Sequence, residues 1–166
     1  VVFDLNQSRL AEMERELADD RLRFFVGDVR DVSRVRQAME ECDIVLHCAA
    51  LKIIPSCEYN PIEAIKTNIF GTQNVIEAAT DLEPEKVLGI SSDKACSPLN
   101  LYGATKLCME RLLVAANYIK GRRRTVFSCA RYGNVLGSGE SVLLVWKEQA
   151  KKEKTIAELI RAMLRM

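Results

Sequence analysis

Several features that would point to particular classes of protein are missing from this sequence. No apolar run approaches the roughly 18 residues of a membrane span, and the chain opens on a strand-like Val-Val-Phe-Asp instead of a secretory signal. Acidic and basic residues nearly cancel, 23 against 24, so no net field favours nucleic acid or an anionic membrane. The six cysteines form no C-x-x-C pair, which argues against disulfides and metal sites. We therefore expect a cytoplasmic protein with reduced thiols and no nucleic-acid, membrane or metal partner.

Apolar runs of strand length alternate along the chain with amphipathic helical stretches. This alternation is typical of an α/β protein with a parallel sheet. The run 44–48 predicts a strand buried on both faces, in which His47, the only histidine, is a satisfied core residue. Asn60 before Pro61 predicts the capped start of a helix that continues to Ala79. Strands are expected at 1–4, 22–26, 44–48, 87–90 and 125–130, and helices at 9–19, 31–41, 61–79 and after 100.

The stretch from Lys86 to Leu112 holds the densest group of chemically capable side chains. Its apolar strand ends in Ser-Ser-Asp-Lys (91–94), and the helix that follows carries Tyr102 and Lys106. Four residues apart on a helix, these two side chains share one face. An ammonium beside a phenol favours the phenolate, so the pair is suited to acid–base chemistry near neutral pH. The preceding strand-end cluster makes this pattern far more specific than a Tyr-x-x-x-Lys by chance.

With these motifs, the chain resembles the extended short-chain dehydrogenase/reductases, and more narrowly the inverting UDP-N-acetylglucosamine 4,6-dehydratases. The similarity runs in register from about Val1 to Gln149. It implies a Rossmann-like doubly wound parallel sheet, NAD as cofactor with NADP possible, and a UDP-sugar substrate in polysaccharide or glycan biosynthesis. The similar blocks are FFVGDVRD (24–31), CEYNP (57–61), KTNIFGTQNVIEAA (66–79), SSDKA (91–95), NLYGATK (100–106) and RYGNVLGS (131–138).

The resemblance implies a catalytic role for each of five residues. Tyr102 would take the proton from the sugar's 4-hydroxyl, while Lys106 would hold the cofactor ribose and lower the tyrosine pKa. Lys94 would remove the proton at C5, and Asp93 would protonate the departing 6-hydroxyl. Ser92 stands where the family usually has threonine and keeps the hydroxyl. The Asp-Lys pair is the feature that suits the inverting subclass.

A second set of residues is expected at the cofactor. Asp4 ends the first strand, where an acid commonly bonds the adenosine ribose and repels a 2′-phosphate, which favours NAD over NADP. The plainer interpretation of Asp4 is a helix N-cap, although Ser8 is nearer to that position. By resemblance, Asp28 and Val29 flank the adenine ring; the plainer interpretation is a polar turn. The further implied cofactor contacts are Ala49, Ala50, Asn68, Ser91, Tyr102, Lys106 and Val135.

Substrate contacts are implied at two residues. Lys52 follows a strand in a loop where a lysine could meet substrate, although the family's next residue, a histidine, is Ile53 here. Asn134 would contact the sugar-nucleotide phosphates; without the resemblance it would be part of a capping turn. Further on, Ser-Gly-Glu-Ser (138–141) replaces the family's Ser-Arg-Gly-Ser, which removes an arginine suited to an anionic ligand.

The resemblance is incomplete at both ends. No G-x-G-x-x-G occurs, and the first strand with its glycine-rich loop, which supplies the pyrophosphate site, has no counterpart. That strand is central in the usual order, so two half-sheets would face a gap that closes or that a missing piece or partner fills. We expect a partial NAD-binding Rossmann domain over 1–150 and an amphipathic helix over 151–166, with the substrate subdomain absent and a homo-oligomer possible.

Three functions are consistent with these observations. The leading hypothesis is a nucleotide-sugar 4,6-dehydratase that is impaired in this fragment. The second is a non-catalytic remnant or a partner-dependent fragment, favoured by the missing loop. The third is a sugar-nucleotide 4-epimerase, which uses the same Tyr102 and Lys106 but has no need of Asp93 and Lys94.

Overall fold

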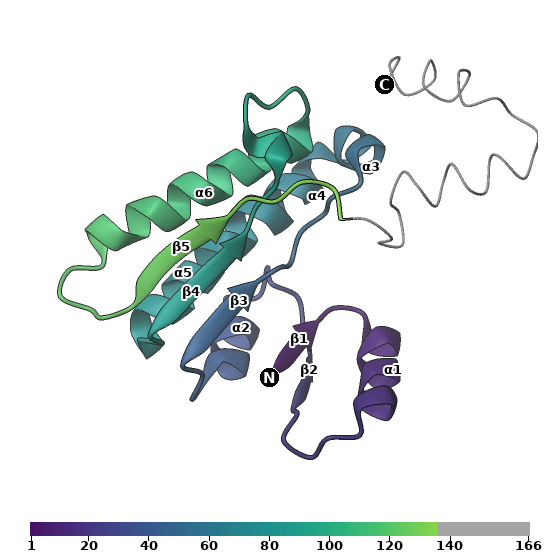
Figure 1. The fold of residues 1–166 in the computed structure, drawn as a ribbon, viewed down its shortest axis with the longest axis vertical. Helices are drawn as coiled ribbons and strands as arrows, with labels where there is room; N and C mark the ends of the chain where they lie inside the picture. The colour runs from purple at the N-terminus through teal and green to yellow at the C-terminus, as the bar shows by residue number, and fades with distance from the viewer. Residues whose placement is uncertain (136–166) are drawn as a thin grey trace, which may run out of the picture. The chain divides into compact units, whose positions relative to one another are not determined.

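The structure is a computed structural model that describes residues 1–135, and the compact unit Val1–Tyr132 contains all its helices and strands. Strands and helices alternate along the chain as predicted, and each strand runs parallel to its neighbours (Figure 1). The strands are β1 (Val2–Asp4), β2 (Phe24–Val26), β3 (Ile44–His47), β4 (Lys86–Ile90) and β5 (Val126–Ala130). The helices are α1 (Gln7–Leu17), α2 (Val32–Met39), α3 (Ile54–Tyr59), α4 (Pro61–Ile65), α5 (Gly71–Leu82) and α6 (Leu101–Ile119), with shorter turns η1 (Lys66–Phe70) and η2 (Asp93–Ala95).

The strands form two separate parallel sheets, as expected for a Rossmann-like fold without its central strand. One sheet pairs β1 with β2, and the other has the order β3-β4-β5. Val2 lies opposite Phe24 in the first sheet, and Val45, Val87 and Phe127 share one row of the second. Within the described residues, β1 and β3 therefore each keep one edge without a partner strand.

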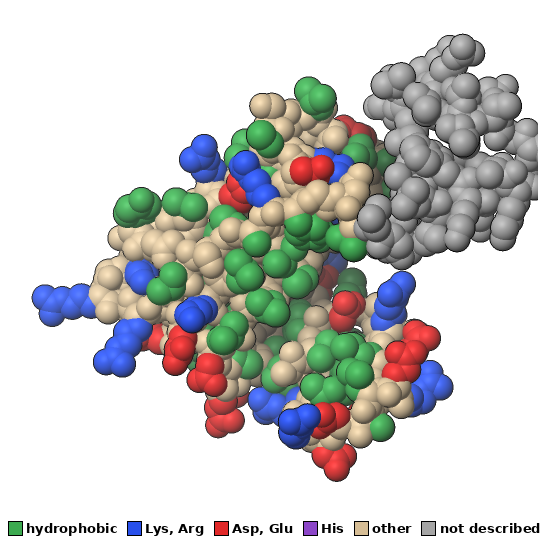
Figure 2. Space-filling model, in the orientation of Figure 1, with side chains coloured by type: hydrophobic (Ala, Val, Ile, Leu, Met, Phe, Trp, Pro, Cys, Tyr) green, Lys and Arg blue, Asp and Glu red, His purple; other side chains and the backbone are tan. Residues whose placement is uncertain are grey.

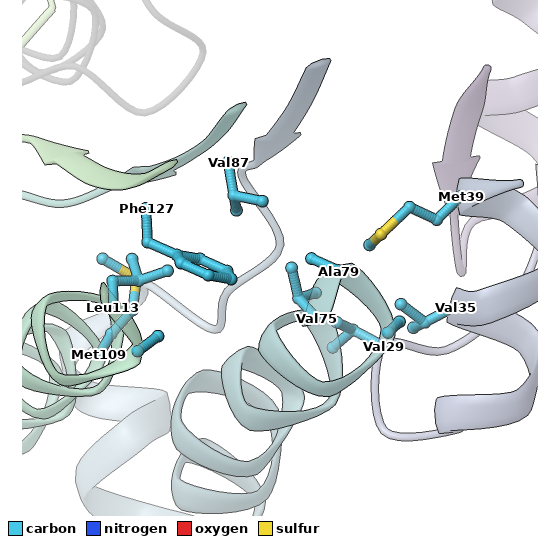
Figure 3. Packing of buried hydrophobic residues seen from close by; sticks show 11 residues of the cluster. Val29, Val35, Met39, Val75, Ala79, Val87, Met109, Leu113 and Phe127 are labelled. Carbon is cyan, nitrogen blue, oxygen red and sulfur yellow. The ribbon is translucent and has the colours of Figure 1, made fainter. Parts of the chain in front are cut away.

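The core lies between the β3-β4-β5 sheet and the helices α5 and α6 (Figure 3). Val87 and Phe127 project from the sheet against Met109 and Leu113 of α6, and all four are at most 3% exposed. A Cβ at Gly89 would overlap the side chain of Leu113, so the glycine lets α6 pack directly on β4. Burial of each large apolar side chain contributes roughly 1.5–3 kcal/mol, which fixes the helix that carries Tyr102. The other core residues are Val29, Val35, Met39, Val75, Ala78, Ala79 and Ala116.

The prediction that the strand at 44–48 is buried on both faces is wrong. Ile44 is 57% exposed and Leu46 63% exposed, whereas Val45 and His47 point to the helix-covered face. The face that carries Ile44 and Leu46 has no helix over it in the described part of the chain, and Figure 2 shows hydrophobic side chains in the open there. One face of this parallel sheet thus lacks the helical cover that such sheets ordinarily have.

The predicted helix over 61–79 is divided by a π-helical turn, η1, between α4 and α5. The side chain of Asn60 does not cap this helix, because its amide donates to the Ser56 carbonyl at 3.0 Å. At α1, Asn6 instead of Ser8 is the N-cap, accepting from the Arg9 amide at 3.1 Å. Among residues 1–135, no helix is both long enough and apolar enough to cross a membrane.

Candidate active site

The N-terminus of α6 sets the positions of Tyr102 and Lys106. Asn100 caps this helix by accepting from the Gly103 amide at 2.9 Å, and Glu58 accepts from the Leu101 amide at 2.7 Å. A Cβ at Gly103 would overlap the carbonyl oxygen of Lys94, so the first turn of α6 lies directly against η2. The glycine in Tyr-Gly-Ala-Thr-Lys therefore brings the tyrosine helix onto the strand-end cluster.

Lys106 is buried below this turn. It is 3% exposed, and its Nζ donates to the Ile90 carbonyl at 2.7 Å, at the C-terminal end of β4. Burial lowers the pKa of Lys106 to about 8, with the thiol of Cys48 and Glu110 acting in the opposite direction. The amine is thus held at a strand end and titrates near neutral pH.

Polar side chains gather where Tyr102 meets the strand-end cluster. The side chain of Ser92 acts on the Tyr102 phenol and lowers its pKa. The Ser92 hydroxyl donates to Asp93 Oδ1 at 2.9 Å, and Lys94 Nζ lies 3.0 Å from the same oxygen. The hydrogen bonds from Lys94 and Ser92 hold the pKa of Asp93 below its usual value. The side chains of Asp93 and Lys94 are 51% and 34% exposed, so this part of the cluster is open to solvent.

The pKa of Tyr102 shifts in the direction opposite to the one expected. Burial raises it, and the effect of the Ser92 side chain, which lowers it, offsets this only in part. Lys106 does not depress the phenol's pKa in this structure, because its ammonium is directed to the Ile90 carbonyl. The phenol is therefore protonated at neutral pH.

Predicted cofactor residues converge on one cavity of about 920 Å³ between the β1-β2 and β3-β4-β5 sheets. The carboxylate of Asp4 lies at its rim and accepts from the Asn6 amide at 2.7 Å. The small side chains of Ala49 and Ala50, just after β3, leave the backbone open to the cavity. The predicted cofactor residues among its lining are Asp4, Asp28, Val29, Ala49 and Ala50; Asn68, Ser91, Tyr102 and Lys106 are not.

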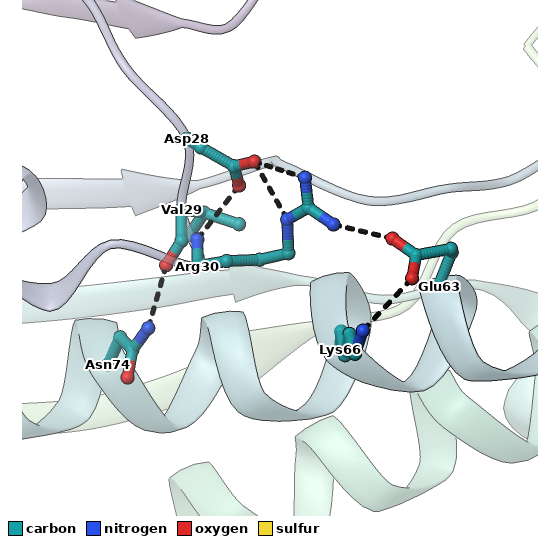
Figure 4. A network of polar contacts seen from close by, with 6 residues as sticks. All are labelled: Asp28, Val29, Arg30, Glu63, Lys66 and Asn74. Carbon is teal, nitrogen blue, oxygen red and sulfur yellow. Dashed lines mark hydrogen bonds and ion pairs between the residues drawn. The ribbon is translucent and has the colours of Figure 1, made fainter.

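Asp28 and Val29 are held at the cavity by a network that the sequence did not suggest (Figure 4). Arg30 Nε donates to Asp28 Oδ2 at 2.7 Å, which lowers the pKa of Asp28, and Arg30 also bonds Glu63 of α4. Asn74 Nδ2 donates to the Val29 carbonyl at 3.0 Å. The loop after β2 is thus tied to α4 and α5, which gives the predicted adenine contacts a defined position.

Asn68, predicted as a cofactor contact, braces the backbone beside the cavity lining. It is 1% exposed in the π-helical turn, and its amide group binds both the amide and the carbonyl of Leu51, at 2.8 and 2.9 Å. Its Nδ2 also donates to Thr105 Oγ1 at 2.9 Å. One side chain therefore joins the loop after β3 to the residue preceding Lys106.

His47 is a satisfied core residue, as predicted, and its partner Thr72 was not foreseen. His47 is 4% exposed and its Nε2 lies 2.9 Å from Thr72 Oγ1. The Thr72 hydroxyl donates its single proton to the Asn68 carbonyl at 2.7 Å, so Nε2 must be the donor to Thr72. Burial lowers the pKa of His47 to about 4, which keeps the ring neutral.

A second unforeseen group ties α6 to the ends of β4 and β5. Glu110 accepts two bonds from Arg131, at 2.7 and 2.6 Å, and the hydroxyl of Ser91 also donates to it. Ser91 is 2% exposed, and its hydroxyl is engaged here and not at the cavity. In the sequence, Glu110 had the appearance of one more solvated helix charge.

The remaining predicted residues are less constrained. Lys52 is exposed in the loop between β3 and α3. Asn134 and Val135 are exposed and belong to a second compact unit that begins at Gly133. The predictions for residues 136–138, for Ser-Gly-Glu-Ser at 138–141 and for the helix over 151–166 lie outside the described residues.

In this structure, parallel strands alternate with helices. A strand-end Ser-Asp-Lys cluster lies beside the tyrosine of a helix that carries Tyr-x-x-x-Lys. Together these features define a Rossmann-like protein of the extended short-chain dehydrogenase/reductase class. The sequence matches the family described as polysaccharide biosynthesis protein over residues 1–165. The chain belongs to this family.

Several known proteins resemble the chain along most of its length. An uncharacterised membrane protein of Methanocaldococcus jannaschii is 56% identical over 91% of the chain and 45% of its own length. The inverting UDP-N-acetylglucosamine 4,6-dehydratase of Campylobacter jejuni is 46% identical over 95% of the chain and 48% of its own length. The chain therefore spans about half the length of these relatives.

Solved structures also resemble this chain, and each match again covers about half or less of the known protein. Pen from Bacillus thuringiensis superposes with a TM-score of 0.87 at 47% identity, over 92% of this chain and 49% of that one. The UDP-glucose 4-epimerase of Brucella ovis, solved in complex with NAD, superposes with a TM-score of 0.61 at 26% identity, over 67% of this chain and 38% of that one.

Proposed function

We propose that this chain carries the catalytic residues and the adenosine-side cofactor contacts of an inverting UDP-N-acetylglucosamine 4,6-dehydratase. The observation that carries the proposal is the packing of the first turn of α6, which holds Tyr102, against η2, where Asp93 accepts from both Ser92 and Lys94. Of the residues in this chain, oxidation of the sugar's 4-hydroxyl by the cofactor would use Tyr102 and Lys106. Elimination of water across C5 and C6 would need a further base and a further acid, which Lys94 and Asp93 would supply. The 46% identity to an enzyme of this name supports the same assignment.

The residues around the cavity fit the adenosine half of a dinucleotide. Asp4 presents a carboxylate suited to ribose hydroxyls and unsuited to a 2′-phosphate, so we propose NAD over NADP. Asp28 and Val29 would lie at the base, and Ala49 and Ala50 would allow close approach of the backbone. When bound, the nicotinamide would supply reversible oxidation at C4 of the sugar. Residues 1–166 contain no glycine-rich loop for the pyrophosphate, so this part of the site needs other polypeptide.

Tyr102 is the proposed base toward the 4-hydroxyl. Its raised pKa means that it begins as a phenol, so its own proton must leave before it can accept one from the 4-hydroxyl. The Ser92 oxygen can take the phenol's proton only as the Ser92 hydroxyl proton moves to the Asp93 carboxylate, to which it is hydrogen-bonded. Lys106, with a pKa of about 8, provides a nearby amine whose charge can vary near neutral pH and which can bind a ribose hydroxyl. Lys52 is a further proposed substrate contact, in the loop between β3 and α3. Asn134, in the second compact unit, is proposed as a substrate contact on the resemblance alone.

Asp93 and Lys94 are the proposed acid and base of the elimination, and the position of one proton between them decides whether the two are both charged or both neutral. With the proton on Asp93, the neutral Lys94 amine can remove the proton at C5 while the Asp93 carboxyl protonates the departing 6-hydroxyl as water. The product of these transfers is an Asp93 carboxylate beside a Lys94 ammonium. This is the ion pair that the hydrogen bonds and the lowered pKa of Asp93 describe.

The test uses a chimera in which residues 1–166 replace the matching half of the Campylobacter jejuni dehydratase. We expect the chimera to convert UDP-N-acetylglucosamine to a 4-keto-6-deoxy product, detected by NMR. Lys94→Ala should lower turnover by at least ~100-fold, the lower end for loss of a general base. Lys86→Ala is the matched control, because Lys86 is exposed at the N-terminal end of β4, the end opposite Ser91–Lys94. A folded, NAD-binding Lys94→Ala chimera that still forms product would refute the role of Lys94.

A further inference from the structure

Glu110 of α6 receives hydrogen bonds from the ends of two neighbouring strands. Gly89 of β4 pairs in register with Cys129 of β5, and the next residues on the same face of these strands are Ser91 and Arg131. The hydroxyl of Ser91 and the guanidinium of Arg131 both donate to the Glu110 carboxylate. We call Ser91, Glu110 and Arg131 the carboxylate clamp, because one carboxylate connects α6 to the ends of β4 and β5, where the predicted catalytic residues lie.

Both oxygens of this carboxylate are occupied. Oε1 accepts from Arg131 Nε at 2.7 Å and from the Ser91 hydroxyl, and Oε2 accepts from Arg131 Nη2 at 2.6 Å. Two parallel bonds between a guanidinium and a carboxylate fix the direction of the pair as well as its distance. Glu110 is 8% exposed, and the bonds from Arg131 hold its pKa below the usual value, so the carboxylate is ionised at neutral pH. The carboxylate clamp is therefore a fixed connection within the protein.

The strand end that carries Arg131 also holds the proposed general acid. The carbonyl of Tyr132, the next residue, accepts from the Asp93 amide at 3.0 Å. Asp93 begins η2, and the Lys94 carbonyl of the same turn lies against Gly103 in the first turn of α6. η2 is therefore in contact with the end of β5 and with α6, and the carboxylate clamp fixes these two elements to each other.

We propose that Glu110 and Arg131 are positioning residues for the elimination of water, because the carboxylate clamp sets the place of η2 relative to Tyr102. The inference rests on the proposed dehydratase function and assigns to it two residues for which no role was predicted. Tyr102 and Lys106 belong to α6 itself, so oxidation at C4 keeps these residues when the clamp is broken. The acid and the base of the elimination belong to η2 and depend on the clamp for their position. Misplacement of a reacting group by about 1 Å can cost roughly 100-fold in rate.

The kinetic test follows single turnovers of UDP-N-acetylglucosamine by the chimera with the Campylobacter jejuni dehydratase. In Arg131→Met we expect oxidation at C4 at nearly the rate of the unmodified chimera and loss of water at least ~10-fold slower. A 4-keto sugar that still carries its 6-hydroxyl should then build up, with an equal amount of reduced cofactor measured by absorbance. The unmodified chimera should show neither.

A second variant guards against misfolding and against an effect through Lys106. Glu110→Gln/Arg131→Met leaves no lone buried charge and keeps an acceptor for the Ser91 hydroxyl, so it should fold where the single variant does not. The Glu110 carboxylate raises the pKa of Lys106, and only the single variant retains that carboxylate. The same build-up in both variants would therefore assign the effect to the position of η2.

Asp81→Asn is the matched control. Asp81 of α5 forms an ion pair with Arg36 of α2, with 2.7 Å between Oδ2 and Nη1. This pair lies at the end of α5 that precedes β4, whereas η2 follows the other end of β4. Asp81→Asn should show no build-up of oxidised sugar. Slower product formation without that build-up in the double variant, or the same build-up in Asp81→Asn, would overturn the proposal.

A second measurement, on residues 1–166, needs no catalysis. The amide of Asp93 should exchange with deuterium at least ~10-fold faster in the double variant, because its acceptor, the Tyr132 carbonyl, is no longer held in place. The Val126 amide bonds to the Glu85 carbonyl at the opposite end of β5 and should not change. An inactive unmodified chimera would count against the dehydratase proposal alone, since the exchange at Asp93 tests the carboxylate clamp by itself. Unchanged exchange at Asp93 would overturn the clamp whatever the chimera does.

Discussion

Lys106 and His47 are buried bases whose ionisation the surrounding protein opposes. Burial lowers the pKa of Lys106 to about 8 and that of His47 to about 4, and the lysine's charge adds to the effect on the histidine. Each group also has a fixed acceptor, the Ile90 carbonyl for the lysine and the Thr72 hydroxyl for the histidine. The lysine is thereby poised near neutral pH, while the histidine remains a neutral structural donor.

The depressed pKa of His47 makes stability depend on pH in one window. Because the unfolded ring titrates near 6.5 and the folded ring near 4, unfolded chains bind more protons between these values. His47 therefore contributes stability that is fully present above pH 6.5 and is lost as the pH falls toward 4. Between pH 7 and 5 the free energy of unfolding should fall by roughly 2 kcal/mol more in the wild type than in His47→Gln. Urea unfolding at both pH values checks this, and equal losses would contradict it.

Asn68 should be the least replaceable polar residue of the π-helical turn. Asn68→Ala leaves both backbone groups of Leu51 and the Thr105 hydroxyl without this partner, in a place that is 1% exposed. We expect a loss of about 2–4 kcal/mol in the free energy of unfolding. Asn74→Ala removes one bond, to the Val29 carbonyl, and should cost about 1 kcal/mol. If urea titrations gave Asn68→Ala and Asn74→Ala similar losses in the free energy of unfolding, Asn68 would have no special role in bracing the backbone.

At the level of elements, two short irregular segments, η1 and η2, position candidate site residues alongside the regular helix α6. The π-helical turn η1 directs Asn68 toward Leu51, and η2 holds Asp93 through its amide, which donates to the Tyr132 carbonyl at 3.0 Å. The first turn of α6 then lies against η2 at Gly103. Such local departures from regular geometry are common at functional sites.

The contact at Gly103 predicts a cost for the smallest possible side chain. Gly103→Ala would force the new methyl group into the Lys94 carbonyl, so α6 and η2 must separate. We expect a loss of about 1–3 kcal/mol in stability by thermal or urea unfolding. Gly133→Ala has open space around the new Cβ and should stay within ~0.5 kcal/mol of the wild type. A neutral Gly103→Ala would show that the contact can relax without cost.

For the whole molecule, the separation of the two sheets decides what this chain can do alone. The residues proposed for the adenosine side line the cavity between the two sheets, and residues 1–166 contain no G-x-G-x-x-G for the pyrophosphate. The chain also spans about half of its relatives' length. Catalysis by residues 1–166 alone is therefore not expected.

This view predicts the response of the isolated chain to NAD. Ligands that bind the folded state raise the unfolding temperature in proportion to ln(1 + [L]/Kd). Without the pyrophosphate loop we expect little or no shift for residues 1–166, measured by calorimetry up to millimolar NAD. The chimera with the Campylobacter jejuni dehydratase is the positive control and should show a clear shift. Saturation of the isolated chain at micromolar NAD would contradict the prediction.

The alternation of strands and helices and the family followed from local sequence, and the same local patterns carry the predicted site residues. A strand-end Ser-Ser-Asp-Lys, a Tyr-x-x-x-Lys and alternating apolar runs are patterns within short windows, where neighbours in the chain set the geometry. The capping by Asn6, the exposure of Ile44 and Leu46, and the raised pKa of Tyr102 did not follow from such windows. The last two depend on which distant surfaces cover a residue, and the partnerships of His47 with Thr72 and of Glu110 with Arg131 depend on which distant groups meet. Burial and long-range hydrogen bonding arise only when the elements pack together.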